Sequence, residues 1–271
     1  MSLPAYVISL SDAAGRRRVM ASELAAARVE AEFHDAVDSR AVPEAKLLES
    51  CRSEGPWGLF HAHNMACTIS HAQVWQRLLD SGADWALVME DDIFVSPELG
   101  AWLDDTGWIP GDADLVKIER WLGSSLKVLL SEPGTRHLGR IIRRMRSRHS
   151  GGAGYFIHAR AARTLLASRP FDVTLDQLLF NANVSPIARG FHIYQVTPAL
   201  VQQGNHPPDE HKWIGLPRER PEGAMLARQR LRRAWYEVAF PLSTFRDFVT
   251  GRARLEQIDY EPRMAPAEAA A

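Results

Sequence analysis

The chain has 271 residues, of which 46% are hydrophobic and 24% charged, a composition typical of one large globular domain with or without a tail. The formal net charge of −1 says nothing about partners, because the charges are unevenly placed. A nucleic acid is not expected as partner, because the sequence has no recognition motif and is not basic outside residues 136–149. Two cysteines provide no disulfide framework, which favours a reducing compartment. We find neither a signal peptide nor a run of ~18 apolar residues that would span a membrane, so we expect a cytoplasmic protein.

The first 40 residues have the pattern of a βαβ unit. Residues 5–10 and 32–37 are apolar strand candidates, and a helical pattern lies between them. Nucleotides bind at the open ends of such units. Arg16, Arg17 and Arg18 fall in the first helical turn, where the helix dipole favours anions instead. A bound diphosphate would explain these arginines, and a solvent-exposed helix surface is the alternative.

The sequence is organised around an apolar run at residues 85–89 that ends in Glu90, Asp91 and Asp92. The run predicts a strand buried on both faces, and ligands of α/β sheets bind beyond the carboxyl ends of such strands. Two carboxylates ~5 Å apart repel each other by roughly 3 kcal/mol at an effective dielectric constant near 20. A divalent cation with oxygen ligands would relieve this repulsion. The alternative is that the acids are solvated turn residues.

The rest of the first 203 residues alternates helical and strand patterns, which predicts an α/β fold. Three histidines near the start of one helix, His61, His63 and His71, lack a second ligand pair with zinc-like spacing, so we interpret them as hydrogen-bonded structural residues. The patterns predict helices at 43–51, 64–79, 97–103, 160–167 and 175–180, and strands at 115–118, 127–130, 155–157 and 191–196.

Two further stretches have unusual composition. Residues 136–149 contain six arginines and no acid, which indicates contact with an anionic acceptor or membrane surface, or else a mobile solvated loop. The glycine-rich residues 150–154 are either a loop that lets a ligand approach the backbone or a plain connector.

The composition changes after residue 203, where proline and charged residues become frequent. Residues 224–240 predict a basic amphipathic helix, which would lie on an anionic membrane or pack against its own domain or a second subunit. Residues 262–271 are expected to be disordered. We therefore divide the chain into a domain at 1–205 and a C-terminal extension at 206–271.

Several segments, taken together in this order, resemble glycosyltransferase family 25, which includes lipopolysaccharide-type galactosyl- and glucosyltransferases. Each segment is weak alone, and the resemblance runs from about residue 5 to 203. The segments are YVISL at 6–10 with Arg16 and Arg17, AVD at 36–38, CTISH at 67–71, EDD at 90–92, GYFI at 154–157, LD at 175–176 and PALVQ at 198–202.

The resemblance implies a GT-A-like α/β fold, a Rossmann-like, mostly parallel mixed sheet flanked by helices that binds a nucleotide sugar. It implies that Mn²⁺ or Mg²⁺ binds at Asp92 and Glu90, with His206 as a further ligand. Asp176 matches the position of the general base, with Asp172 in reserve. The implied donor-binding residues are Ser9, Leu10, Arg16, Arg17, Asp38 and Asp91, and the implied acceptor-binding residues are Gly154 and Tyr155.

Two functions follow from this resemblance. The first is an inverting, metal-dependent transferase that moves galactose or glucose from a UDP-sugar to a lipopolysaccharide or other envelope glycan, with peripheral contact to the inner face of the membrane through the basic segments. The second is an inactive nucleotide- or carbohydrate-binding relative that acts as a scaffold in envelope glycan assembly. The intact acids favour the first. The second is suggested by departures from the family pattern at Gly15, His63, Asn64 and Ala66.

Overall fold

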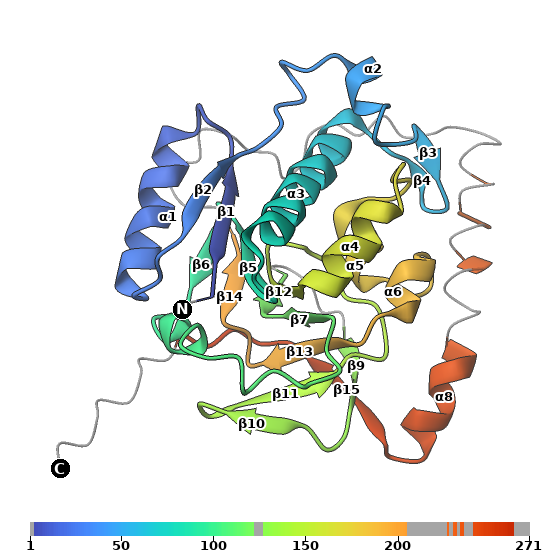
Figure 1. The fold of residues 1–271 in the computed structure, drawn as a ribbon. Coiled ribbons are helices and arrows are strands. Elements are labelled where there is room, and N and C mark those ends of the chain that lie inside the picture. The colour runs from blue at the N-terminus through green and yellow to red at the C-terminus, as the bar shows by residue number, and fades with distance from the viewer. Residues whose placement is uncertain are drawn as a thin grey trace, which may run out of the picture.

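The computed structural model has a central sheet of eight strands, ordered β10-β11-β13-β7-β12-β5-β1-β2 (Figure 1). All of these strands except β11 and β12 run in the same direction. The structure describes residues 3–121, 127–204 and 241–262, and positions 227, 230, 231, 234 and 235. The strands are β1 (Ala5–Ser9), β2 (Glu32–Asp35), β5 (Trp85–Glu90), β7 (Leu115–Lys117), β10 (Thr135–His137), β11 (Arg140–Arg144), β12 (Gly154–His158) and β13 (Ile193–Thr197).

The predicted βαβ unit is present, with α1 (Ala14–Ala26) between the parallel strands β1 and β2. On its other side β1 pairs with β5, also in parallel, and Ile8 lies opposite Glu90. This register brings the carboxyl ends of β1 and β5 to the same edge of the sheet. The residues that follow these two strands therefore lie close together although they are about 80 positions apart in the sequence.

Helices cover both faces of the sheet, so β5 is buried on both sides as expected (Figure 1). Val88 belongs to the core cluster formed with α3 (Ala62–Ser81), α4 (Ala159–Ala167) and α5 (Leu175–Phe180). Its neighbour Leu87 belongs to the opposite cluster, formed with α1 and the short 3₁₀ helix η1 (Leu99–Trp102). Alternate side chains of a strand point to opposite faces, which explains this division. The predicted α/β class, a mostly parallel mixed sheet flanked by helices, is confirmed.

Three small sheets complete the fold, one of which adds a residue to the carboxyl edge of β5. In that sheet, ordered β6-β14-β8, Gln203 pairs with Ile93. The remaining described elements are α2 (Glu44–Leu47), β3 (Glu54–Gly55), β4 (Gly58–Leu59), β6 (Ile93–Val95), β8 (Glu119–Arg120), β9 (Lys127–Ser131), α6 (Pro186–Gly190), β14 (Val201–Gln203), α8 (Pro241–Val249) and β15 (Ala253–Gln257).

The described C-terminal residues pack against the rest of the chain. Strand β15 pairs with β9 in an antiparallel ladder, and the Ala199 N–H donates to the Asp259 carbonyl over 2.7 Å. The division at residue 205 stays a prediction. The expected basic helix at 224–240 lies mostly outside the described residues, as does the tail beyond Pro262. Among the described residues, no helix is both long enough and apolar enough to cross a membrane.

Two predicted helices are shorter than expected. The helix expected at 43–51 is limited to α2. The one expected at 97–103 is only the 3₁₀ turn η1. In η1 the Gly100 N–H donates to the Ala27 carbonyl at the end of α1, and a Cβ on Gly100 would lie 2.4 Å from that oxygen. Close docking of this turn against α1 therefore replaces regular helix.

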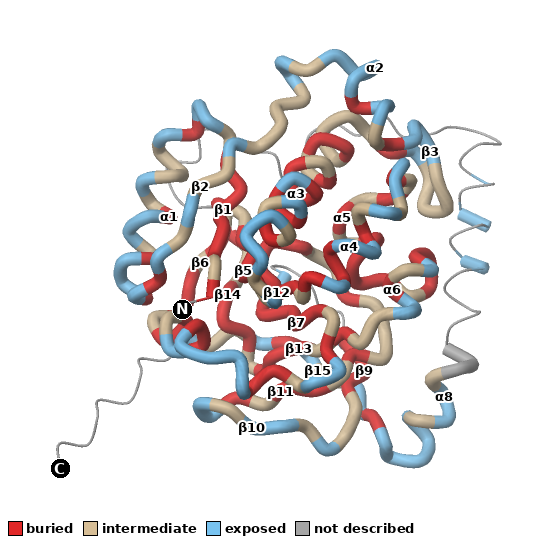
Figure 2. The backbone as a smooth tube through the Cα atoms, viewed as in Figure 1, coloured by how far each residue is buried: buried red, intermediate tan, exposed pale blue. Residues whose placement is uncertain are grey.

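The arginine-rich segment is not a mobile loop, so that interpretation was wrong. It forms the hairpin of β10 and β11 at one end of the central sheet, and β11 is largely buried (Figure 2). Arg140 is fully buried and forms an ion pair with Glu98. Arg143 is buried beside Glu256 of β15. These two arginines have structural partners and are not free to contact a membrane or an acceptor.

Candidate active site

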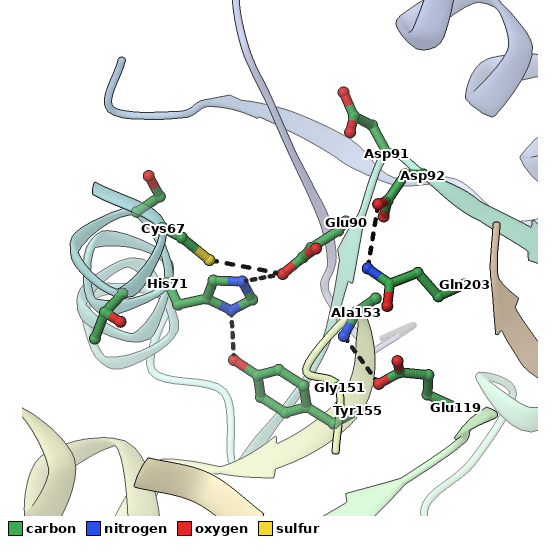
Figure 3. A network of polar contacts seen from close by, with 12 residues as sticks. Cys67, His71, Glu90, Asp91, Asp92, Glu119, Gly151, Ala153, Tyr155 and Gln203 are labelled. Atoms are coloured by element: carbon green, nitrogen blue, oxygen red, sulfur yellow. Dashed lines mark hydrogen bonds and ion pairs between the residues drawn. The ribbon is translucent and has the colours of Figure 1, made fainter. Parts of the chain in front are cut away.

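The three central acids lie where β5 leaves the sheet, and they differ in their surroundings (Figure 3). The negative charge of Asp91 is compensated by its neighbours. Its carboxylate accepts a hydrogen bond from the Ser9 hydroxyl over 2.6 Å and lies 2.5 Å from the Arg16 guanidinium. This pairing links the ends of β1 and β5 to the first turn of α1. Whether Asp91 also contacts a donor hydroxyl stays a prediction.

Only one of the two carboxylate oxygens of Asp92 has a hydrogen-bond partner among the described residues. One oxygen, Oδ2, accepts a hydrogen bond from Gln203 over 3.1 Å and lies 3.7 Å from Arg16. The other, Oδ1, is buried without a partner among the described residues. Burial, and then the nearby charge of Glu90, raises the pKa of Asp92 to about 8. A buried carboxylate oxygen without a donor is what a hard divalent cation binds, and the side chain remains 15% exposed and hence reachable.

Glu90 points toward Cys67 and His71 on α3, whereas the Asp92 carboxylate contacts Gln203 (Figure 3). Its Oε1 lies 3.2 Å from His71 Nε2 and 3.8 Å from the Cys67 sulfur. Burial, and then the charge of Asp91, raises the pKa of Glu90 to about 7. The ligand atoms of Cys67, His71 and Glu90 lie within 4.8 Å of one another, a spacing that would also suit a metal ion. Burial raises the pKa of the Cys67 thiol well above its usual value.

The arginines at the start of α1 have separate roles. Arg16 faces the acids, whereas Arg17 holds the end of β1 through the carbonyls of Ser9, at 2.8 Å, and Leu10, at 3.0 Å. Arg17 also pairs with Asp35 at the end of β2. Of the two, Arg16 is therefore the one whose guanidinium lies beside the acids, and its contact with a donor stays a prediction. Donor binding through Ser9, Leu10 and Arg17 stays a prediction.

Asp38 follows β2 at the same edge of the sheet. The Arg40 Nε donates to its two carboxylate oxygens over 2.8 and 2.9 Å, and the same guanidinium donates to Asp12 over 2.7 Å. The predicted contact of Asp38 with a donor hydroxyl is not tested by these bonds.

Asp176 lies in the first turn of α5 and faces the same region. The Thr174 hydroxyl donates to its Oδ1 over 2.6 Å, and the Gln177 amide donates to Oδ2 over 2.9 Å, which fixes the carboxylate. Its charge acts on both Cys67 and Glu90, so it lies near the central acids. The reserve candidate Asp172 packs its carbonyl against Gly55. The predicted ligand His206 lies outside the described residues.

Tyr155 is fully buried, and its hydroxyl lies 2.8 Å from His71 Nδ1 and 2.9 Å from the Trp75 indole nitrogen. At Gly154, an added Cβ would lie 2.4 Å from a methyl group of Val201. Both residues thus have close protein neighbours in this structure, and their predicted contact with an acceptor remains untested.

A buried ion pair beside the acids escaped the sequence analysis. Lys117 Nζ lies 3.0 Å from Glu119 Oε2, and both side chains are fully buried. Lys117 donates to the carbonyls of Ser150 and Gly151, while Glu119 accepts from the Ala153 N–H over 3.0 Å. The pair therefore fixes the glycine-rich segment, so it is more than a plain connector. Two charges spaced two apart in an apolar strand were the available signal, because such residues share a face.

The glycine-rich segment also depends on a backbone conformation that favours glycine. Gly151 has φ of +85°, and a Cβ there would lie 2.1 Å from Glu119 Oε1. Burial raises the pKa of Glu119 and lowers that of Lys117. A larger residue at 151 would displace the ion pair that fixes the backbone next to Glu90.

Comparison with known proteins identifies the family. The model of "Glycosyltransferase family 25 (LPS biosynthesis protein)" matches residues 2–179. The chain belongs to glycosyltransferase family 25. It is 30% identical over 217 residues to the lacto-N-neotetraose biosynthesis glycosyltransferase LgtB of Neisseria gonorrhoeae, covering 74% of each chain. It is 28% identical over 224 residues to the lipooligosaccharide biosynthesis protein lic2B of Haemophilus influenzae, covering 76% of this chain and 79% of that protein.

The family assignment makes the chain a glycosyltransferase and gives the acids at the end of β5 an enzymatic context. Among solved structures, a glycosyltransferase involved in glycosylation of the major capsid of PBCV-1 matches with a TM-score of 0.37 and 9% identity, covering 85% of this chain and 99% of that one. This similarity is too low to support an argument about residues of the site.

Proposed function

We propose that this family 25 glycosyltransferase moves a hexose, galactose or glucose, from a UDP-sugar to a lipopolysaccharide or other cell-envelope glycan, in a metal-dependent reaction that inverts the anomeric configuration. The observation that carries the proposal is Asp92 Oδ1, a buried oxygen without a hydrogen-bond partner among the described residues, near Glu90 at the carboxyl edge of β5. The relatives are named for lacto-N-neotetraose and lipooligosaccharide biosynthesis, which supports the class of acceptor.

Asp92 and Glu90 suit a divalent ion such as Mn²⁺ or Mg²⁺ because both provide carboxylate oxygens, the ligands that hard cations prefer. Both pKa values are raised in the metal-free protein, which indicates that their negative charges lack full compensation. When bound, the ion would supply Lewis-acid stabilisation of the diphosphate leaving group. His206 remains the predicted further protein ligand.

Arg16 would provide the second positive charge at the donor site. Its guanidinium is 13% exposed, between Asp91 and Asp92. An arginine stays protonated throughout the physiological pH range and binds phosphate oxygens through paired N–H donors. A fixed cation where negative charge develops on the departing nucleotide stabilises the transition state.

Asp176 would act as the general base of a single displacement. An acceptor hydroxyl oxygen forms a bond to C1 of the sugar while its proton passes to the Asp176 carboxylate. The bond between C1 and the diphosphate oxygen breaks, and UDP leaves with that electron pair. The hydrogen bonds from Thr174 and Gln177 hold the carboxylate in a fixed orientation for this transfer.

The direct test is UDP release from UDP-galactose and UDP-glucose with an envelope glycan acceptor, in Mn²⁺ and in chelator. We expect Mn²⁺-dependent release, and a product whose anomeric proton shows inverted configuration by NMR. Asp176→Asn should lower kcat strongly while UDP binding persists, since the base does not hold the nucleotide. A retained anomeric configuration, or full turnover by Asp176→Asn, would overturn the mechanism.

A further inference from the structure

A buried chain of hydrogen bonds runs from the core to Glu90 and has no part in the mechanism above. The Trp75 indole N–H lies 2.9 Å from the Tyr155 hydroxyl, which lies 2.8 Å from His71 Nδ1. His71 Nε2 lies 3.2 Å from Glu90 Oε1 (Figure 3). The side chains of Trp75, Tyr155 and His71 are fully buried.

The chemistry of the groups fixes the direction of this chain. An indole N–H can only donate, so the Tyr155 oxygen accepts from Trp75. The tyrosine proton is then free to bond His71 Nδ1, which accepts it. Because Nδ1 accepts this proton, the ring carries its own single proton on the other nitrogen. That proton lies on Nε2 and is donated to Glu90.

This direction of hydrogen-bond donation argues against a metal ion bound by Cys67, His71 and Glu90. A metal on His71 Nε2 would place the ring proton on Nδ1, pointing at Tyr155. The Tyr155 oxygen would then accept two hydrogen bonds, and its own proton would lose His71 as acceptor. A proton without an acceptor in a buried site costs about 1–3 kcal/mol. The hydrogen-bonded relay therefore explains the cluster better than a metal does.

The fold positions the relay through two elements. Cys67, His71 and Trp75 are four residues apart on α3, so they lie along one face of this helix. Tyr155 lies opposite Val88 in the pairing of β12 with β5, two residues before Glu90. Cys67 and His71 both contact Oε1 of Glu90, and no side chain in the described part of the chain forms a hydrogen bond with Oε2, which can therefore face a ligand.

We propose that Trp75, Tyr155 and His71 are positioning residues that hold Glu90 Oε1 and thereby present Oε2 to the divalent ion of the nucleotide-sugar donor. This inference rests on the proposed function, because it assumes that the ion binds at Glu90 and Asp92. Groups that orient a metal ligand in this way typically alter metal affinity by about 10–100-fold when removed.

The test compares Tyr155→Phe, which removes only the hydroxyl, with Thr68→Val, which removes a buried hydroxyl bonded to the Asn64 carbonyl on the same helix. Mn²⁺ affinity is measured by electron paramagnetic resonance titration, without turnover. We expect Tyr155→Phe to bind Mn²⁺ about 10–100-fold more weakly and Thr68→Val to match the wild type. His71→Gln, whose amide can still donate to Glu90, should bind better than His71→Leu.

A second readout needs no metal. ¹⁵N NMR of the metal-free protein should show His71 neutral and protonated on Nε2, and Nδ1 protonation would overturn the relay. Wild-type Mn²⁺ affinity in Tyr155→Phe would overturn the relay alone, whereas a wild-type protein that binds no Mn²⁺ would overturn the proposed function as well. Stoichiometric Zn²⁺ binding that is lost in Cys67→Ser would replace the relay with a metal site.

Discussion

The acids after β5 and the arginine hairpin of β10 and β11 are two charged clusters that suggested ligand binding for the same reason, an excess of one sign of charge. The structure separates them. Arg140 is buried with donors directed at the carbonyls of Pro198, Ala199 and Glu261, and it pairs with Glu98. Asp92, at the other cluster, keeps a buried oxygen with no partner among the described residues.

The comparison shows that a buried charge alone does not indicate a binding site. What distinguishes the two clusters is whether the buried polar atoms already have partners within the protein. Buried polar atoms in folded proteins nearly always have partners, so a satisfied one contributes to the fold and an unsatisfied one requires another explanation. By this criterion Arg140 contributes to the fold, and Asp92 is a candidate for a ligand. Arg143 Nε also lacks a hydrogen bond among the described residues, but it lies 3.7 Å from Glu132, so its charge is compensated.

Asp92→Asn should have the largest effect, because it removes a charge without a change in size. Loss of about 4 kcal/mol of transition-state stabilisation would lower kcat/KM by roughly 1,000-fold. Kinetics in saturating Mn²⁺ measure this, and Asp112→Asn, a carboxylate at the opposite edge of the sheet, is the control that should keep wild-type activity. Unchanged kcat/KM in Asp92→Asn would remove the acids from the mechanism.

Arg140→Met should lower the free energy of unfolding and leave the catalytic activity unchanged. The substitution leaves Glu98 buried without its cation, which costs about 3 kcal/mol of unfolding free energy. Urea unfolding gives this value, and kcat/KM per folded molecule should stay close to that of the wild type. A normal unfolding free energy combined with lost activity would instead place the hairpin in the site.

The raised pKa values predict a pH-dependent stability in the metal-free protein. Asp92 has a pKa of about 8 in the folded protein against an ordinary value of 3.8. Between these pH values the folded state therefore binds more protons than the unfolded state, and stability falls as pH rises. His71 acts in the opposite sense, but only below pH 6.5. Between pH 7 and 8 the wild type should lose up to about 1.4 kcal/mol, and Asp92→Asn less.

Thermal unfolding in chelator from pH 7 to 8 checks this difference. Glu90, whose pKa is about 7, contributes in the same direction in both proteins. Identical slopes for the wild type and Asp92→Asn would mean that Asp92 is already ionised and compensated without a ligand.

Arg136→Ala should have the smallest effect. This arginine belongs to the same hairpin as Arg140 but is exposed, and substitutions at exposed positions usually change the unfolding free energy by less than about 0.5 kcal/mol. Urea unfolding should show the large difference between the two arginines. A loss at Arg136 equal to that at Arg140 would contradict the division between satisfied buried charge and solvated charge.

The sequence predicted those helices and strands that have a clear apolar periodicity within their own residues. The ranges of β1, β5 and α3 agree with the structure to within about two residues, because apolar periodicity determines which face each element buries. The candidate site could be predicted only as far as the acids, which end the apolar run of β5, and Arg16, which lies in the first turn after β1.

The remaining features depend on partners far away in the sequence. Glu256 lies 113 positions from Arg143, so no local pattern distinguished the hairpin from a solvated loop. The relay likewise joins Tyr155 to His71 across 84 positions. Such contacts become visible only after the strands are placed in register.

The most direct test of the central claim is calorimetric titration of UDP into the wild-type protein, once with Mn²⁺ and once with chelator. A ligand held jointly by Asp92, Glu90 and an ion should bind at least about tenfold more tightly with Mn²⁺, since a divalent ion bridges carboxylates and phosphates. Equal affinity in the two conditions would contradict the claim that these acids hold a metal for the departing nucleotide.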